Sequence, residues 1–350
     1  MSATTTEANY LLTQRGVSKD LGAFVVAARF SRDGQTVAFA LGDGTVWLAK
    51  PADLSAWAHV AAHDGAILDA APDAIGDGFI TGGDDGAVKR ISAGGEVTDI
   101  ASFGAMKWVE HVATFPIDRK RGLITASAGK LVKLFDETGK ELKSFTHPST
   151  VTGLAFDGKG KRIGASHYNG VTLWFVAAKT DTPRKLEWKG SHTTVIIHPE
   201  GEAVVTAMQE NALHGWKLPD GQHMRMSGYP SKTQSLSFSR NGKWLATSGA
   251  DAMVMWPFFG GGPMGKAPLE LAGGDGIICQ QVACHPKQDI VAGGFADGLV
   301  VVADIESSRI LPVAPPDHGP VTALAWSPDG THLAIGTETG FAAVVDFSKR

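Results

Sequence analysis

The sequence predicts an all-β protein that forms a single β-propeller of eight four-stranded antiparallel blades, with its ring closed by an N-terminal strand. Three observations predict this fold: a segment of one layout recurs eight times, each copy alternates apolar and polar residues, and glycine-containing turns separate its runs. A period of about 40–45 residues with short strands is typical of propeller blades. Seven blades is the alternative, if the second or third copy proves irregular.

Each copy contains an alternating run, a polar turn, a second run, another turn and a third run. The apolar residue that closes the first run recurs at spacings of 41 to 46 residues, from Phe30 to Trp326. The copies span residues 25–50, 67–91, 109–136, 151–175, 193–217, 233–256, 278–304 and 321–346.

The alternation within each run predicts a strand with a buried face, because side chains point to opposite sides of a sheet with a period of two. A weaker fourth strand follows the third in several copies, at 140–146, 184–189, 268–272 and 309–313. Four-stranded sheets of this kind bury their apolar faces by stacking radially, which leaves only short edges. Frequent Gly, Thr and Val and the recurring turns argue against long helices.

The domain organisation follows from the last copy, which ends at its third strand. We expect the strand-like segment 8–17, "ANYLLTQRGV", to supply the missing fourth strand, and closure of the ring to remove open sheet edges. The propeller is therefore expected to span 8–347, with a flexible N-terminus at 1–7 and a C-terminal tail at 348–350.

Composition limits the classes of function. The chain has 32 basic and 36 acidic residues in 350, interspersed without a basic stripe, so no nucleic-acid partner is expected. No apolar run reaches the 18 residues of a membrane span, and "MSATTTEANY" lacks the pattern of a signal peptide. Two cysteines are too few for a disulfide-built secreted fold. We expect a cytoplasmic protein with no membrane partner.

Several short motifs recur at fixed places in the copies. "FSRDG" (30–34), "FSRNG" (238–242) and "WSPDG" (326–330) follow first strands, and Trp47, Trp174, Trp216 and Trp256 lie in third strands. Histidines precede first strands at positions 63, 147 and 318, and an aspartate stands in the turn before four third strands. These blade-turn aspartates are Asp43, Asp85, Asp251 and Asp297.

On these motifs the sequence resembles the WD-repeat β-propeller family over residues 8–347. The resemblance implies that the four blade-turn aspartates are structural and that the chain is a non-catalytic scaffold for other proteins. No copy holds every element of the family pattern, so the hydrogen-bonded tetrad typical of the family is expected to be incomplete in each blade.

The stretch "GGGPMGK" (260–266) satisfies the phosphate-binding pattern G-x-x-x-x-G-K. A working phosphate loop also needs a following helix and a Ser or Thr after the lysine, whereas Ala267 and Pro268 follow Lys266 in this chain. The segment is in register with the third-to-fourth-strand turns of the other copies. We therefore expect a long turn and no nucleotide or other cofactor.

No catalytic or metal constellation is predicted. There is no G-x-S-x-G nucleophile elbow, and the four-residue spacing of His59 and His63 would align two metal ligands only on a helix. His198 and His285 fall in turns after first strands, where we expect them to face solvent.

Loops with exposed aromatic and Met side chains are the predicted contact sites, since such residues concentrate at interfaces. Three loops are expected at one end of the ring: 102–108, 166–170 and 227–232. The long turn 257–268 is expected at the other. The predicted protein-interaction residues are Phe103, Met106, Trp108, His167, Tyr168, Tyr229, Phe258 and Phe259.

The favoured function is a monomeric ring, without enzymatic activity, that binds other proteins or peptides through its loops and flat ends. The identity of the partner is left open. The alternative is an enzyme or small-ligand carrier that uses the central channel, lined by polar first-strand residues such as Glu110, His111, Gln280 and Gln281.

Overall fold

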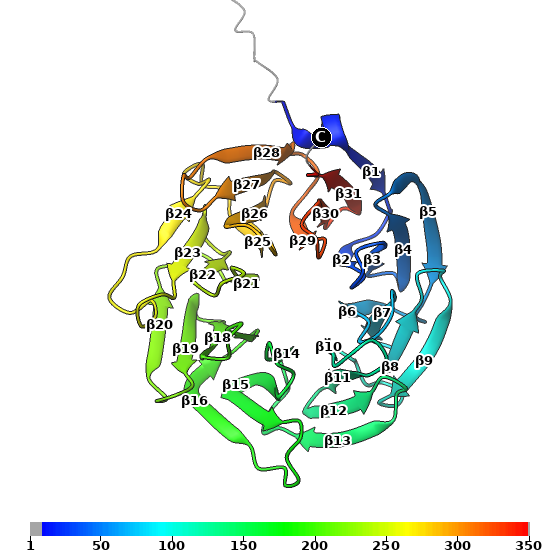
Figure 1. The fold of residues 1–350 in the computed structure, drawn as a ribbon, viewed down its shortest axis with the longest axis vertical. Coiled ribbons are helices and arrows are strands. Elements are labelled where there is room, and N and C mark those ends of the chain that lie inside the picture. Colours follow the sequence, from blue (N-terminus) through cyan, green and yellow to red (C-terminus); the bar gives the residue numbers. More distant parts are fainter. Residues whose placement is uncertain (1–8, 349–350) are drawn as a thin grey trace, which may run out of the picture.

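The computed structural model describes residues 9–348, and they form a closed ring of eight antiparallel sheets (Figure 1). Within each sheet, strands that are consecutive in sequence are hydrogen-bonded neighbours, apart from the closing strand. The first strand of each blade lies nearest the centre of the ring and the last lies at its rim. The eight-bladed propeller expected from the sequence is therefore confirmed, and the seven-bladed alternative is wrong.

The strands of each blade follow one another from the centre of the ring outward. Blade 1 contains β2 (Val25–Phe30), β3 (Val37–Leu41), β4 (Thr45–Lys50) and β5 (Asp53–Ala61). Blade 2 contains β6 (Ile67–Pro72), β7 (Phe79–Gly83), β8 (Ala87–Ile91) and β9 (Val97–Ser102). Blade 3 contains β10 (His111–Pro116), β11 (Gly122–Ala128), β12 (Leu131–Asp136) and β13 (Glu141–Thr146). Blade 4 contains β14 (Gly153–Phe156), β15 (Arg162–Phe175) and β16 (Arg184–Ser191).

The second half of the ring repeats this order. Blade 5 contains β17 (Ile196–Ile197), β18 (Ala203–Met208), β19 (Ala212–Lys217) and β20 (His223–Ser227). Blade 6 contains β21 (Leu236–Phe238), β22 (Trp244–Thr247), β23 (Met253–Pro257) and β24 (Leu269–Leu271). Blade 7 contains β25 (Cys279–Cys284), β26 (Ile290–Phe295), β27 (Val300–Asp304) and β28 (Ile310–Ala314). Blade 8 contains β29 (Val321–Trp326), β30 (His332–Thr337), β31 (Phe341–Asp346) and β1 (Gly16–Asp20).

Blade 4 has three labelled strands because β15 contains both the second and the third strand. Its first half pairs with β14 over 163–166, and its second half pairs with β16 over 170–173. The chain reverses between these halves at Tyr168 and Asn169, where Asn169 has a left-handed φ of 71°. Asn tolerates this conformation better than most residues, which accounts for a reversal without a break in the strand.

The recurring Ser-x-Asp/Asn-Gly turns give several blades the same connection between their first and second strands. In blade 1, the Ser31 hydroxyl donates to the Asp33 carboxylate at 2.6 Å and accepts from the Thr36 amide at 3.0 Å. Gly34 follows with φ 74°, a conformation that disfavours side chains. The same hydrogen bond joins Ser239 to Asn241 and Ser327 to Asp329 in blades 6 and 8.

The hydrophobic core is distributed over the blade interfaces. The buried apolar residues form eight clusters, and each cluster joins two neighbouring blades. The second strands β3, β7, β11 and β18 are buried along their whole length, because both of their faces pack on adjacent sheets. Each blade thus depends on its neighbours for its core, as stacked repeats do.

Two histidines expected to face solvent instead tie neighbouring blades together. His198 and His285 are 6% and 5% exposed. Each donates its Nε2 proton to a turn carbonyl of the next blade at 3.0 Å: His198 to Gly242 and His285 to Gly330. The expectation was wrong because the ring stacks each of these turns under the following blade.

The N-terminal segment closes the ring, although its strand begins later than expected. β1 pairs with β31 from Gly16↔Val345 to Asp20↔Phe341. Leu11–Arg15 form a short helix, α1, in place of the first part of the expected strand, because Leu12 is buried between blades 7 and 8. The strand expected at 8–17 is thus corrected to Gly16–Asp20. The expected N-terminus at 1–7 and residues 349 and 350 of the expected tail lie outside the described residues.

Among residues 9–348, no helix is long and apolar enough to cross a membrane.

Candidate functional site

The antiparallel order of the strands gives the ring two chemically different ends. One end, which we call the inter-blade end, carries the loops between consecutive blades and the turns between second and third strands. The other, the hairpin end, carries the first-to-second and third-to-fourth turns. Every candidate residue can be assigned to one of these ends from its place between strands.

The loop 103–110 between blades 2 and 3 presents the most exposed apolar side chains. Met106 is 93% exposed and Trp108 is 60% exposed. The loop is held at both ends by the β7–β8 turn, because the Phe103 amide donates to Gly86 O at 2.9 Å and the Val109 amide to Gly83 O at 3.0 Å. Both side chains therefore project from a fixed base.

Two further features distinguish this loop. Met106 has a left-handed φ of 60°, which is uncommon for a residue with a side chain and often occurs at functional positions. Phe103 is half-buried, and the Lys133 ammonium lies 5.3 Å from its ring. Met106 and Trp108, two of the three residues predicted for this loop, are thus exposed. The third, Phe103, packs against the core between blades 2 and 3.

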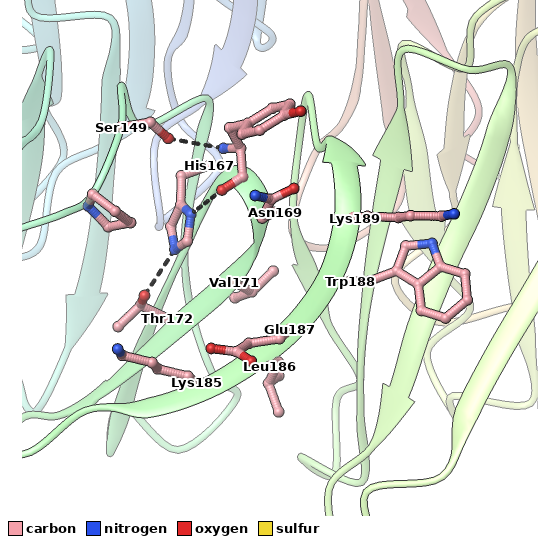
Figure 2. A pocket seen from close by; sticks show the side chains of 12 residues that line it. Ser149, His167, Asn169, Val171, Thr172, Lys185, Leu186, Glu187, Trp188 and Lys189 are labelled. Carbon is pink, nitrogen blue, oxygen red and sulfur yellow. Dashed lines mark hydrogen bonds between the residues drawn. The ribbon is translucent and has the colours of Figure 1, made fainter.

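A cavity of about 680 Å³ lies at blade 4, beside the reversal in β15 (Figure 2). Tyr168 is 58% exposed at its edge, and the backbone amide of Tyr168 donates to the Ser149 hydroxyl at 3.0 Å. Lys185, Glu187 and Lys189 of β16 also line it. Figure 2 shows these three side chains along the outer strand of the blade.

His167, predicted as a contact residue, is buried. Its Nδ1 proton is donated to Tyr168 O at 2.8 Å and its Nε2 accepts from the Thr172 hydroxyl at 2.8 Å (Figure 2). Burial lowers the pKa of His167 below its ordinary value. This side chain supports the reversal and is not available as an exposed contact.

Tyr229 is also buried, at 8% exposed. Its hydroxyl accepts from Trp256 Nε1 at 2.6 Å and bonds the Thr247 hydroxyl at 2.6 Å. Burial raises the pKa of Tyr229 to about 12. The prediction of a surface contact at Tyr229 is wrong because its phenol side chain packs into blade 6, at the position where other copies carry a histidine.

The long turn of the hairpin end, residues 258–268, presents one aromatic side chain. Phe259 is 45% exposed, whereas Phe258 is half-buried and packs edge-on against Phe238 with ring centroids 5.0 Å apart. A cavity of about 490 Å³ lies beside the turn. Phe259 is therefore accessible and Phe258 contributes to the blade interface.

The glycine-rich stretch in this turn does not have the context of a phosphate loop. The Lys266 ammonium donates to the Phe259 and Gly260 carbonyls and lies 4.8 Å from the centre of the Phe259 ring. Strand β24 follows where a phosphate loop would begin a helix, as expected from the sequence. Lys266 closes its own loop.

The two ends differ in charge. The loops of the inter-blade end carry eleven acidic residues and three lysines, all exposed or half-buried, whereas those of the hairpin end carry fourteen acidic and thirteen basic residues. The inter-blade loops, with three basic and eleven acidic residues, thus carry a net charge of −8, against −4 for the whole chain. The charged residues there are Asp43, Asp64, Asp84, Asp85, Glu110, Glu210, Asp251, Asp275, Asp297, Asp317, Glu338, Lys107, Lys130 and Lys232.

The mouth of the central channel at this end holds a smaller cavity of about 290 Å³. Gln280 and Gln281 line it, as expected, together with Phe24 and Glu338, and Gln234 donates to the Gln280 side chain at 3.2 Å. Glu110 and His111, also expected at the axis, are not part of this lining. The channel mouth thus combines amides, one carboxylate and one aromatic ring.

Three of the four blade-turn aspartates hold second-to-third-strand turns. Asp43, Asp85 and Asp297 each accept a backbone amide two residues ahead at 3.0 Å. Asp85 also accepts the Nδ1 proton of His63 at 2.9 Å. Asp251 occupies the same turn of blade 6, with no side-chain hydrogen bond within the described part of the chain.

The His63–Asp85 pair in blade 2 continues through a hydrogen bond between His63 Nε2 and the Thr81 hydroxyl at 2.8 Å. Lys89 stands in the third strand of this blade at the place where other blades carry tryptophan. Blade 6 replaces the histidine with Tyr229. These blades therefore use different partial versions of one network.

Residues 9–348 contain no group of three or more His, Cys, Asp or Glu side chains placed to hold a metal ion. Both cysteines are free thiols, and burial raises the pKa of Cys279 and of Cys284 to about 12.

At the inter-blade end, sequence reasoning missed two exposed apolar residues and the negative charge. Phe24 and Ile277 are 43% and 38% exposed on loops between blades. Single apolar residues in short loops give no signal in one sequence. The charge asymmetry was detectable, because assigning loops alternately to the two ends of each copy separates the acidic residues.

Comparisons with known proteins agree with this architecture. Two family profiles match parts of the chain: the anaphase-promoting complex subunit 4 WD40 domain over residues 282–350, and the WD domain, G-beta repeat, over 222–256. The crystal structure of the computationally designed Ika8 protein superposes with a TM-score of 0.75, covering 94% of this chain and 98% of that one at 20% identity. At that identity the likeness concerns the fold alone.

Curated relatives are similar at low identity. The serine-threonine kinase receptor-associated protein of Dictyostelium discoideum is 26% identical over 224 residues, 62% of this chain and 73% of that protein. Autophagy-related protein 16 of Arabidopsis thaliana is 23% identical over 75% of this chain and 52% of its own length. Telomerase protein component 1 of Mus musculus is 25% identical over 63% of this chain and 8% of its own length. This chain thus spans about half or less of the last two relatives' length.

Proposed function

The chain belongs to the WD-repeat β-propeller family, and from that premise we propose that it is a non-catalytic scaffold that binds other proteins through the loops of its inter-blade end. The observation that carries the proposal is the loop 103–110, which presents Met106 and Trp108 to solvent on a base fixed by two backbone hydrogen bonds. Tryptophan on a preorganised surface is a frequent anchor of protein interfaces.

The hydrogen bonds of four histidine side chains also support a role as a scaffold. His63, His167, His198 and His285 form hydrogen bonds that hold turns, blades or a strand reversal. The side chains of all four histidines are also buried, so they support geometry and do not face a substrate. Fold alone does not fix function, so the proposal depends on the exposed surface.

Compartment and assembly are part of the proposal. We place the protein in the cytoplasm as a monomeric ring, a placement supported by two free thiols. The acidic inter-blade end argues against a nucleic-acid partner, because phosphate backbones need basic surfaces. The Dictyostelium relative is named as a receptor-associated protein, which favours a partner-binding role for this chain by analogy.

The test is affinity purification of the tagged full chain from its native source, with quantitative mass spectrometry. Three forms are compared: the wild type, Trp108→Ala, and Phe259→Ala as the matched aromatic control at the hairpin end. We expect Trp108→Ala to lose at least about tenfold in captured partner, the effect of removing a typical interface anchor. Phe259→Ala should retain the partners.

Two results would contradict the proposal. One is a wild-type ring that captures no protein above the bead control. The other is full retention of all partners by Trp108→Ala together with their loss from Phe259→Ala, which would move the site to the hairpin end.

A further inference from the structure

We propose that the inter-blade end docks a basic segment of a partner protein, in which lysine or arginine residues flank apolar side chains. This inference rests on the proposed function and adds the chemistry of the partner to it. It is carried by two observations on one surface: exposed apolar anchors, and a local excess of carboxylates around them.

The anchors and the carboxylates form one continuous surface across blades 2 and 3. The loop 103–110 is bonded to the β7–β8 turn, which contains Asp84 and Asp85. That turn is also bonded to the loop 62–66, because the Asp84 amide donates to Ala66 O at 3.0 Å and the Asp64 amide to the Asp85 carboxylate at 3.2 Å. Carboxylates therefore lie next to the base of the loop that carries Met106 and Trp108.

Only one of these carboxylates has a clear structural use. Asp85 accepts from His63 and holds its turn. The Asp64 side chain is exposed and Asp84 is half-buried, and neither forms an ion pair or side-chain hydrogen bond within residues 9–348. Lys107 lies in the same loop as the anchors, whereas Lys89 and Lys133, in the adjoining third strands, are paired with Asp99 and Glu141. The surface is thus left with negative charge that a cationic partner would neutralise.

Charge complementarity selects among occupants. An acidic segment or a phosphate backbone docked at blades 2 and 3 would meet the carboxylates of the loop 62–66 and of the β7–β8 turn, and like-charge contact costs affinity and slows association. A second copy of this chain would have to present its hairpin end, whose fourteen acidic and thirteen basic residues nearly balance. A segment rich in lysine and arginine is attracted by these carboxylates and is therefore the occupant that the charge favours.

The probes are three fluorescein-labelled pools of 15-residue peptides with the same Leu and Phe positions, whose remaining positions are Lys/Arg, Asp/Glu or Ser/Gln. Fluorescence anisotropy with the full chain measures their dissociation constants at 50 and 300 mM NaCl. We expect the basic pool to bind at least about tenfold more tightly than the acidic pool at low salt. We expect roughly tenfold weakening at high salt, because exposed charges are screened.

The variants separate charge from fold. Asp64→Asn with Asp84→Asn should weaken the basic pool about threefold to tenfold, the effect of removing exposed charge contacts. Lys107→Glu should tighten it by about threefold, a gain that a misfolded protein would not give. Trp108→Ala should weaken it, whereas Asp77→Asn with Glu306→Gln, exposed carboxylates at the hairpin end, should leave it unchanged.

The proposal is overturned if the acidic or neutral pool binds as tightly as the basic pool, if no pool binds, or if Lys107→Glu weakens the basic pool. Concentration-dependent dimers that disappear with Trp108→Ala would assign the surface to a second copy, and would also overturn it. Trp108→Ala could abolish capture of native partners while neither salt nor the charge variants change that capture. In that case this inference fails and the proposed function stands. If no native partner is captured at all, the proposed function fails as well.

Discussion

Replacing Tyr229 with phenylalanine removes one hydroxyl from the buried centre of blade 6 and changes nothing else in the side chain. That hydroxyl accepts from Trp256 Nε1 and bonds the Thr247 hydroxyl, both at 2.6 Å. Thr247 keeps a second partner, because its hydroxyl also donates to Val254 O at 3.1 Å. The indole N–H of Trp256, in a side chain that is 8% exposed, is left without an acceptor.

The expected loss of stability follows from these contacts. A buried hydrogen bond contributes about 1 kcal/mol, and a buried donor left unpaired costs about 1–3 kcal/mol. We therefore expect Tyr229→Phe to lower the free energy of unfolding by about 2 kcal/mol. With an unfolding entropy of about 2.1 cal/mol/K per residue, this corresponds to a fall in Tm of about 3 °C for a chain of this length.

The assay is thermal unfolding followed by circular dichroism, with Tyr168→Phe as the control. Tyr168 is 58% exposed, so removal of its hydroxyl should change stability by less than about 0.5 kcal/mol. Equal Tm values for wild type and Tyr229→Phe would refute the reasoning. So would an equal fall in Tm for the two variants, because the loss would then not depend on burial.

Three further predictions concern the rest of the ring. Burial and the neighbouring His167 lower the pKa of His147 to about 4, against about 6.5 in the unfolded chain. Its contribution to stability is complete above pH 6.5 and is lost as pH falls toward 4, so His147 should account for about 1.3 kcal/mol of the unfolding free energy lost between pH 7.5 and 5.5, measured in urea against His147→Gln. An equal loss of unfolding free energy over this pH range in the wild type and in His147→Gln would contradict this. Cys279 is buried and Cys284 is half-buried, and both thiols have a pKa of about 12, so they should react slowly with maleimide at pH 7 and rapidly after denaturation; rapid labelling of both thiols in the native ring would contradict this. Deletion of residues 1–20 removes α1 and β1 and exposes the β31 edge, so gel filtration should show aggregates, and a stable monomer would refute closure by this segment.

The fold could be predicted because its signals repeat. The period of about 42 residues and the Ser-x-Asp/Asn-Gly turns occur in several copies, so each copy supports the interpretation of the others. The closing segment occurs once, and the insertion of Leu12 between blades 7 and 8 depends on a pocket formed by distant strands. Its helix could not be inferred from local alternation.

The candidate surface was predicted in part for a related reason. Met106, Trp108, Tyr168 and Phe259 are exposed as expected, because loop position is readable from the copies. Burial of His167 and Tyr229 depends on partners such as Thr172 and Trp256, which the single sequence does not pair with them. Loop assignment identifies the end of the ring, while three-dimensional packing decides which side chains reach solvent.

The most direct test of the central claim is site-specific photo-crosslinking in the native source. The photoreactive amino acid p-benzoylphenylalanine replaces Met106 at the inter-blade end or Phe259 at the hairpin end, both exposed positions. Partner capture by the inter-blade end predicts discrete crosslinked bands from position 106, suppressed when Trp108→Ala is added, and none from position 259. Bands from position 259 with none from position 106 would contradict it.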